Sequence, residues 1–342
     1  MNTSTARRPM RTFYLVWIGQ LVSTLGTGLS GFALGVWLYE TTGSVTLFAL
    51  NTLAFVLPMM LFSPFAGALV DRWDRRTAML VADSGAGLGT IGLLILLSTG
   101  TLEIWHIYLV TAWTSFFNTF QWPAYSAATT LMVPKEHLGR ASGMVQMGEA
   151  LSQIVTPIVA AFLIVGIGIV GVIAIDLLTF LFAVTTLVLA RIPSHKGEQV
   201  DDKPSEEQSS LWDEVKFGWR YIVQRPGLLG LLLYFAGFNL INGIATAALI
   251  PMALDLFGTQ TVGVLGTLVG LGALGGTLLM STWGGPKDRV LGVLGGGALS
   301  GIGVALAGLR PSAVLIVVGM GLAMFFLPIL GGSSQGNRIK LE

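Results

Sequence analysis

Cysteine is absent from this sequence of 342 residues, and charged residues are scarce. Without cysteine the chain can form no disulfide and has no thiol for catalysis. Asp, Glu, Lys and Arg together make up 11% of the residues, whereas an ordinary soluble domain carries about 25%. Hydrophobic residues make up 53%, and the mean hydropathy is +0.75. Because so few charges could not cover the surface of a soluble protein of this size, the composition predicts an integral membrane protein.

An excess of positive charge is also lacking, since the formal net charge is +1. We therefore expect no nucleic-acid partner. The sequence contains no P-loop, no H-E-x-x-H zinc motif and no Cys–His set. Residues 166–171 match G-x-G-x-x-G, but they fall in a predicted turn between two apolar segments with no strand before it, so they predict no dinucleotide site. We expect no cofactor, no metal site and no enzymatic activity.

Ten apolar segments are long enough to cross a membrane. A bilayer core about 30 Å thick requires roughly 20 apolar residues in a helix. None of the segments alternates regularly between apolar and polar residues, so the pattern favours an all-α helix bundle over a β-barrel. The predicted spans are residues 13–38, 46–70, 77–98, 104–132, 142–165, 167–190, 228–254, 261–283, 290–308 and 312–331.

The positions of Lys and Arg predict how these spans are oriented. Loops on the cytoplasmic side of a membrane are enriched in these two residues. If the N-terminus is inside, Arg310 is the one basic residue that falls outside. We therefore expect a multi-pass protein of the bacterial cell membrane with both termini in the cytoplasm.

A polar segment divides the spans into two blocks. Residues 191–226 begin with a composition typical of a flexible linker and continue with an amphipathic stretch that we interpret as a helix on the cytoplasmic surface. We predict an N-terminal six-helix half over 1–190, this linker, and a C-terminal half with four helices over 227–342. Two such blocks indicate pseudo-repeated halves. Since a matching second half would also have six spans, we expect ten spans of twelve and a truncated chain.

The segment that joins the second and third spans carries a distinctive motif. It reads Gly67-Ala68-Leu69-Val70-Asp71-Arg72-Trp73-Asp74-Arg75-Arg76. The motif resembles the signature loop G-x-x-x-D-R-x-G-R-R of the major facilitator superfamily, with Asp74 in place of the last Gly, as in its macrolide- and enterobactin-exporter subgroup. Residues 133–141 and 174–180 also resemble that subgroup. Residues 156–161 resemble the antiporter motif G-P-x-x-G-G, with small residues in place of its glycines.

This resemblance implies a major-facilitator-type helix bundle that works by alternating access. It implies proton-coupled export of an amphiphilic small molecule, such as a macrolide-like drug or a siderophore. The expected partners are this substrate, protons and the lipid bilayer, and the protein is expected to be a monomer. Two alternatives stay open, namely an uncoupled metabolite facilitator and a truncated membrane remnant without transport.

The signature loop is the candidate gate. A carboxylate at the end of a span can accept hydrogen bonds from a neighbouring helix N-terminus, and arginines can bridge to acids in one conformer and release them in the other. The alternative is that the arginines only determine topology. The candidate gating residues are Gly67, Asp71, Arg72, Arg75 and Arg76.

Polar residues recur on one face of several predicted spans. Residues 20–27 and 149–156 each place polar side chains at i, i+3, i+4 and i+7, which is one face of a helix. Such a stripe faces the bundle interior or a water-filled path, or it forms hydrogen bonds that only hold the helices together. The candidate substrate residues are Gln20, Asn118, Gln121, Gln153, Asn239 and Asn242.

Three acidic residues, Asp83, Glu149 and Asp176, lie within predicted spans that contain no Lys or Arg to pair with them. Burial without a cation favours the protonated form of a carboxyl group, so each of the three is a candidate proton carrier. Glu149 is the main candidate because it lies on a polar stripe. Asp83 has the alternative of a hydrated site that is ion-paired with the basic loop, and Asp176 the alternative of an interhelical hydrogen bond.

Overall fold

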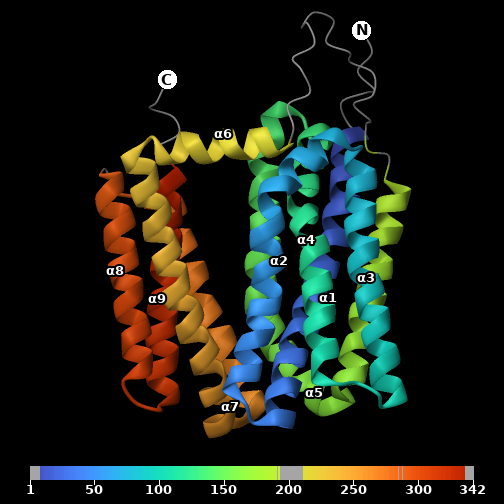
Figure 1. The fold of residues 1–342 in the computed structure, drawn as a ribbon, viewed down its shortest axis with the longest axis vertical. Coiled ribbons are helices and arrows are strands. Elements are labelled where there is room, and N and C mark those ends of the chain that lie inside the picture. The colour runs from blue at the N-terminus through green and yellow to red at the C-terminus, as the bar shows by residue number, and fades with distance from the viewer. Residues whose placement is uncertain (1–7, 191, 193–210, 284, 287, 336–342) are drawn as a thin grey trace, which may run out of the picture. The chain divides into compact units, whose positions relative to one another are not determined.

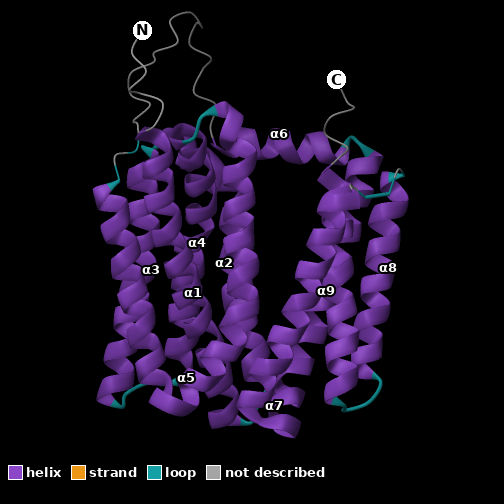
Figure 2. Ribbon diagram, turned by 180° about the vertical axis from the view of Figure 1, so that it is seen from behind, coloured by secondary structure: helices purple, strands orange, loops and turns teal. Residues whose placement is uncertain are grey.

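The computed structural model of the chain describes residues 8–190, 192, 211–283, 285–286 and 288–335. Within these ranges every regular element is a helix, as Figure 2 shows. This confirms the predicted all-α class. Most of the predicted linker, residues 193–210, lies outside the described ranges.

Nine α-helices and one short 3-10 helix follow one another along the described residues (Figure 1). They are α1 (Arg8–Thr42), α2 (Val45–Arg72), α3 (Arg75–Thr99), α4 (Ile104–Met132), the 3-10 helix η1 (Lys135–His137), α5 (Leu138–Leu189), α6 (Leu211–Val223), α7 (Pro226–Trp283), α8 (Arg289–Gly308) and α9 (Ala313–Gln335).

The two longest elements, α5 and α7, each consist of two helices. α5 has 52 residues, and a straight helix of that length would measure about 80 Å, more than twice the thickness of a bilayer core. Gly168 interrupts it with φ 68° and ψ 174°, and Gly258 interrupts α7 with φ 73° and ψ 166°. Both φ values are unfavourable for residues with a side chain and accessible to glycine. The breaks lie at the predicted junctions between the fifth and sixth spans and between the seventh and eighth.

Seven of the described helices are long and apolar enough to cross a membrane. These candidate spans are Met10–Thr42, Val45–Gly67, Arg75–Thr99, Leu138–Leu189, Pro226–Met280, Val290–Gly308 and Ala313–Gly331. Two of them contain the glycine breaks in α5 and α7, and α4 is not among them. The protein is therefore a helical multi-pass membrane protein, and the count of ten spans stays a prediction.

The chain forms two compact units. Unit 1 contains residues 1–27, 50–146 and 173–235, and unit 2 contains residues 28–49, 147–172 and 236–342. This grouping does not test the predicted halves 1–190 and 227–342.

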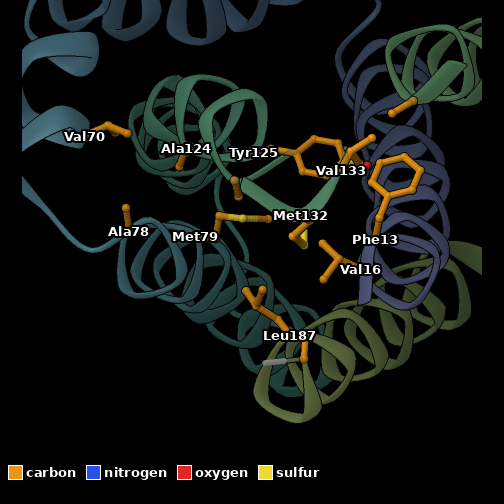
Figure 3. Packing of buried hydrophobic residues seen from close by; sticks show 13 residues of the cluster. Phe13, Val16, Val70, Ala78, Met79, Ala124, Tyr125, Met132, Val133 and Leu187 are labelled. Carbon is orange, nitrogen blue, oxygen red and sulfur yellow. The ribbon is translucent and has the colours of Figure 1, made fainter. Parts of the chain in front are cut away.

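Unit 1 has a core in which side chains from α1, α2, α3, α4 and α5 meet (Figure 3). Phe13, Met79, Met132 and Leu187 are each 0% exposed. In Figure 3 the two methionines lie between α3 and α4 and point toward the side chains of α1 and α5. Because lipid tails are as apolar as these side chains, close packing rather than transfer out of water favours their association.

Unit 2 depends on glycines for close helix contact. A Cβ atom added at Gly276 of α7 would overlap the carbonyl group of Phe325 in α9, and one added at Gly303 of α8 would lie 2.5 Å from the carbonyl oxygen of Gly319 in α9. Backbones that approach this closely leave no room for a side chain, which is the arrangement that small residues allow between membrane helices.

Candidate functional site

Three polar residues from three different helices of unit 1 form a connected group, which we call the Asp83 cluster. Gln20 of α1 donates through Nε2 to Oδ2 of Asp83 in α3 at 2.9 Å. Gln121 of α4 donates through Nε2 to Oε1 of Gln20 at 2.8 Å. Gln20 and Asp83 are each 8% exposed. The structure thus brings together three residues that the sequence placed in separate spans.

The Asp83 carboxyl group is held by neutral amides and not by the basic loop. Within the part of the chain that the structure describes, no cation forms an ion pair with it, and Gln121 also lies within hydrogen-bonding reach of it. Arg75 instead donates to the carbonyl oxygen of Trp73 at 3.1 Å, and Arg76 donates through Nε to that of Leu187 at 3.1 Å. The described contacts of Asp83 are therefore with amides, and its role stays a prediction.

A second buried carboxyl group, that of Asp176 in α5, is 4% exposed. It accepts hydrogen bonds from the hydroxyl groups of Thr27 at 3.5 Å and Thr90 at 3.3 Å. A Cβ atom at Gly26 would lie 3.0 Å from Asp176 Oδ1, so the glycine permits α1 to approach this site. Asp176 therefore links α1, α3 and α5, as the alternative of an interhelical hydrogen bond expects.

The polar stripe that contains Glu149 is divided between two environments in unit 2. Ser152 and Thr156 are buried, and their hydroxyl oxygens are 3.3 Å apart. Glu149 and Gln153 are exposed. The second pair of side chains is therefore accessible, and the first pair is not.

Three further candidate amides lie on α4 and α7. Asn242 of α7 donates to the carbonyl oxygen of Phe238 one turn earlier in its own helix, at 3.0 Å. Asn239 is exposed on α7, and Asn118 is half-buried on α4.

The signature loop is anchored to helix ends. Asp74 caps α3, because its carboxylate accepts from the backbone N–H of Thr77 at 3.1 Å. Arg76 also donates to the carbonyl oxygen of Val188, at the last turn of α5, where a cation favours the helix dipole. Aspartate is a preferred N-cap residue, which accounts for Asp74 at the position of the motif's last glycine.

The other gating candidates described next are Gly67, Arg72 and Asp71. Gly67 lies in α2, and a Cβ atom added there would meet nothing within 4 Å. Arg72 is exposed at the end of α2. The side chain of Asp71 lies outside the described part of the structure, so its gating role stays a prediction.

Sequence reasoning missed one pair of contacts in unit 2. Tyr39 of α1 donates through its hydroxyl group to Asp255 of α7 at 2.8 Å. One residue along α1, Glu40 accepts a hydrogen bond from the hydroxyl group of Thr259. The only signal in the sequence is that Glu40 and Asp255 are both acids predicted on the outer side, which does not indicate that they share neighbouring helices.

An apolar cavity of about 110 Å³ lies in unit 1 between the end of α2, the start of α3 and the middle of α4. Its wall includes Ala82 and Phe120, which directly precede Asp83 and Gln121 in the sequence. Successive residues of an α-helix point about 100° apart, so the cavity and the Asp83 cluster occupy adjoining faces of the same two helices. The cavity is lined by Leu69, Val70, Trp73, Ala78, Val81, Ala82, Phe116, Phe117 and Phe120.

Known proteins resemble this chain in sequence. Macrolide efflux protein A of Streptococcus pyogenes is 30% identical over 303 residues, which cover 88% of this chain and 74% of that protein. The enterobactin exporter EntS of Salmonella typhimurium is 25% identical over 277 residues, which cover 78% of this chain and 62% of the exporter.

Solved structures share the fold. A bacterial homologue of the iron transporter ferroportin in an inward-facing state has a TM-score of 0.69 at 14% identity, covering 97% of this chain and 84% of that one. The nucleoside transporter NupG has a TM-score of 0.71 at 12% identity, with 97% and 83% covered. A sequence model described as Major Facilitator Superfamily matches residues 16–335. The chain belongs to the major facilitator superfamily.

Proposed function

We propose that this protein exports amphiphilic small molecules across the bacterial cell membrane in exchange for protons, by alternating access. Membership of the superfamily points to transport of a small molecule rather than to an enzyme. The names of the relatives, a macrolide efflux protein and an enterobactin exporter, support efflux and an amphiphilic substrate. The observation that supports proton coupling is the Asp83 cluster.

The cluster is suited to both protonation states of its carboxyl group. A side-chain amide can present either its NH₂ group or its carbonyl oxygen to a neighbour. In the structure Gln20 presents NH₂ to Asp83, as an ionised carboxylate requires. If Asp83 gains a proton, rotation of the Gln20 amide would present a carbonyl oxygen to the new O–H donor.

Gln121 can follow the same rotation. Its Oε1 atom is buried and has no hydrogen-bond partner in the structure. After rotation of both amides, this oxygen would accept from the NH₂ group of Gln20. Protonation of Asp83 therefore changes the bonding between α1, α3 and α4, which is how a proton could bias a conformational equilibrium.

The apolar cavity supports an amphiphilic substrate. Its aromatic wall at Phe116, Phe117 and Phe120 can contact an apolar ring or chain. The polar groups nearest to this wall are those of the Asp83 cluster, on the adjoining faces of α3 and α4. Ligand sites commonly combine such an apolar wall with a few polar groups that determine orientation.

The test is Asp83→Asn, which keeps the shape of the side chain and removes its titration. We expect uphill transport driven by a pH gradient in membrane vesicles to stop, while substrate binding persists. The matched control is Asp288→Asn, because Asp288 caps α8 through the backbone N–H of Val290 at 3.0 Å and asparagine caps helices equally well. Full pH-driven export by Asp83→Asn would exclude Asp83 as the coupling residue.

A further inference from the structure

The apolar cavity of unit 1 has the size of one small ring and a wall that is largely aromatic. Its volume is about 110 Å³, and its wall includes the rings of Trp73, Phe116, Phe117 and Phe120. The residues that line it carry no charged group and no side-chain oxygen. A water molecule needs two or more polar partners, whereas an apolar cavity of about 150 Å³ stays dry and binds benzene. The cavity therefore suits one ring of an apolar molecule and not water.

The phenylalanine rings of this wall hold one another in defined orientations. The ring centroids of Phe116 and Phe117 are 5.2 Å apart at an interplanar angle of 87°, and those of Phe116 and Phe120 are 5.2 Å apart at 68°. Phe62 of α2 meets Phe116 from the other helix at 4.8 Å and 89°. Aromatic pairs prefer such edge-to-face contacts. An aromatic guest can extend this arrangement, whereas an aliphatic guest gains only from the area that it buries.

Contacts with α3 fix the position of Phe117. A Cβ atom added at Gly85 would overlap the ring of Phe117, so this ring packs directly on the glycine. The indole N–H group of Trp113 donates to the carbonyl oxygen of Gly85 at 2.7 Å, and the Trp113 ring lies 5.1 Å from that of Phe117. Neither Gly85 nor Trp113 lines the cavity. They are positioning residues for one part of its wall.

The cavity reaches the surface of unit 1 on one side. Trp73 and Val81 line it and are 44% and 42% exposed, whereas Ala78 and Ala82 line it and are 3% and 2% exposed. A ring can therefore enter beside Trp73 and Val81 and come to rest against the buried alanines of α3.

We infer that this cavity binds a single aromatic ring, and that Gly85 determines its specificity by positioning Phe117. The inference rests on the proposed function in one respect, since it makes the ring the apolar part of the exported molecule. It names the substrate class more closely as amphiphiles that carry a benzene-sized aromatic ring.

The test compares two probes of similar size, fluorobenzene and fluorocyclohexane. Their binding to the full chain in lipid nanodiscs is measured by the broadening of their fluorine NMR signals, and empty nanodiscs of the same lipid give the reference for partition into the bilayer. We expect fluorobenzene to bind about two- to twelvefold more tightly than fluorocyclohexane, because an aromatic pair gains about that factor beyond the area that it buries.

Two glycines of α3 give a matched pair of variants. Gly85→Ala forces the ring of Phe117 to move and should weaken fluorobenzene binding by a similar factor. Gly92 lies two turns further along the same face of α3, and a Cβ atom added there meets nothing within 4 Å, so Gly92→Ala should bind as the unchanged chain does. Phe117→Leu keeps an apolar side chain but removes the ring, so it should reduce the ratio between the two probes.

Equal affinity for the two probes, or no binding of either beyond that of empty nanodiscs, would overturn the inference. Equal fluorobenzene binding by Gly85→Ala and Gly92→Ala would overturn the role of Gly85. The measurement needs no pH gradient and no transport. Failure of ring binding is therefore distinguishable from failure of proton-coupled export, which the Asp83→Asn variant tests separately.

Discussion

Two buried carboxyl groups, those of Asp83 and Asp176, accept hydrogen bonds from neutral side chains. Asp83 accepts from the amide of Gln20, and Asp176 accepts from the hydroxyl groups of Thr27 and Thr90. A neutral donor stabilises a carboxylate less than a cation does. For Asp83, the described partners are the amides of Gln20 and, through Gln20, Gln121, and this is the arrangement on which the proposed proton coupling rests.

Glu149 differs from these two residues because it is exposed on unit 2. Its carboxylate can reach a ligand directly, so we expect it to neutralise a cationic substrate. Glu149→Gln should abolish transport of a cationic amphiphile and spare a neutral one, as measured by efflux of one substrate of each kind. Loss of pH-driven export for both substrates would instead assign Glu149 to proton coupling. Unchanged transport of both would remove either role.

At the scale of helices, small residues and glycine breaks determine how closely elements pack. Gly303 of α8 faces the backbone of α9 at Gly319 and Ala323. Gly301, on the same helix, has nothing within 4 Å of an added Cβ atom. Two glycines that look alike in the sequence thus have different structural roles.

These two positions provide a matched pair of variants. Gly303→Ala should lower the free energy of unfolding by about 1–3 kcal/mol, because the added methyl group overpacks the contact with α9. Gly301→Ala should leave stability unchanged or raise it by up to about 1 kcal/mol, because alanine favours a helix more than glycine does. Thermal unfolding in detergent measures both. Equal melting temperatures would contradict the close contact between α8 and α9.

At the scale of the whole molecule, the chain is a multi-pass membrane protein of the major facilitator superfamily. Its orientation in the membrane stays a prediction from the distribution of Lys and Arg, which favours both termini in the cytoplasm. On this prediction the segment between α3 and α4 faces outward, and η1 (Lys135–His137) faces inward.

Cysteine labelling tests this orientation without background, because the chain has no cysteine. Both Thr101 and Glu136 have exposed side chains. Thr101→Cys should react with a membrane-impermeant maleimide in intact cells, and Glu136→Cys should react only after the cells are permeabilised. The reverse pattern would invert the predicted topology.

Features that depend on short stretches of chain could be predicted from the amino-acid sequence. Apolar segments of membrane-spanning length predicted the helical membrane class, and the motif at 67–76 predicted the superfamily, because length, composition and residue order are local properties. The break at Gly168 falls in the predicted turn for the same reason.

The contacts between polar side chains, in contrast, depend on how the helices pack in three dimensions. Gln20, Asp83 and Gln121 are far apart in the chain and become partners because α1, α3 and α4 pack together. Periodicity shows that residues share one face of a helix but not which neighbour covers that face. For this reason a single stripe contains both a buried Ser152 and an exposed Glu149, and the bond from Tyr39 to Asp255 had no local signal.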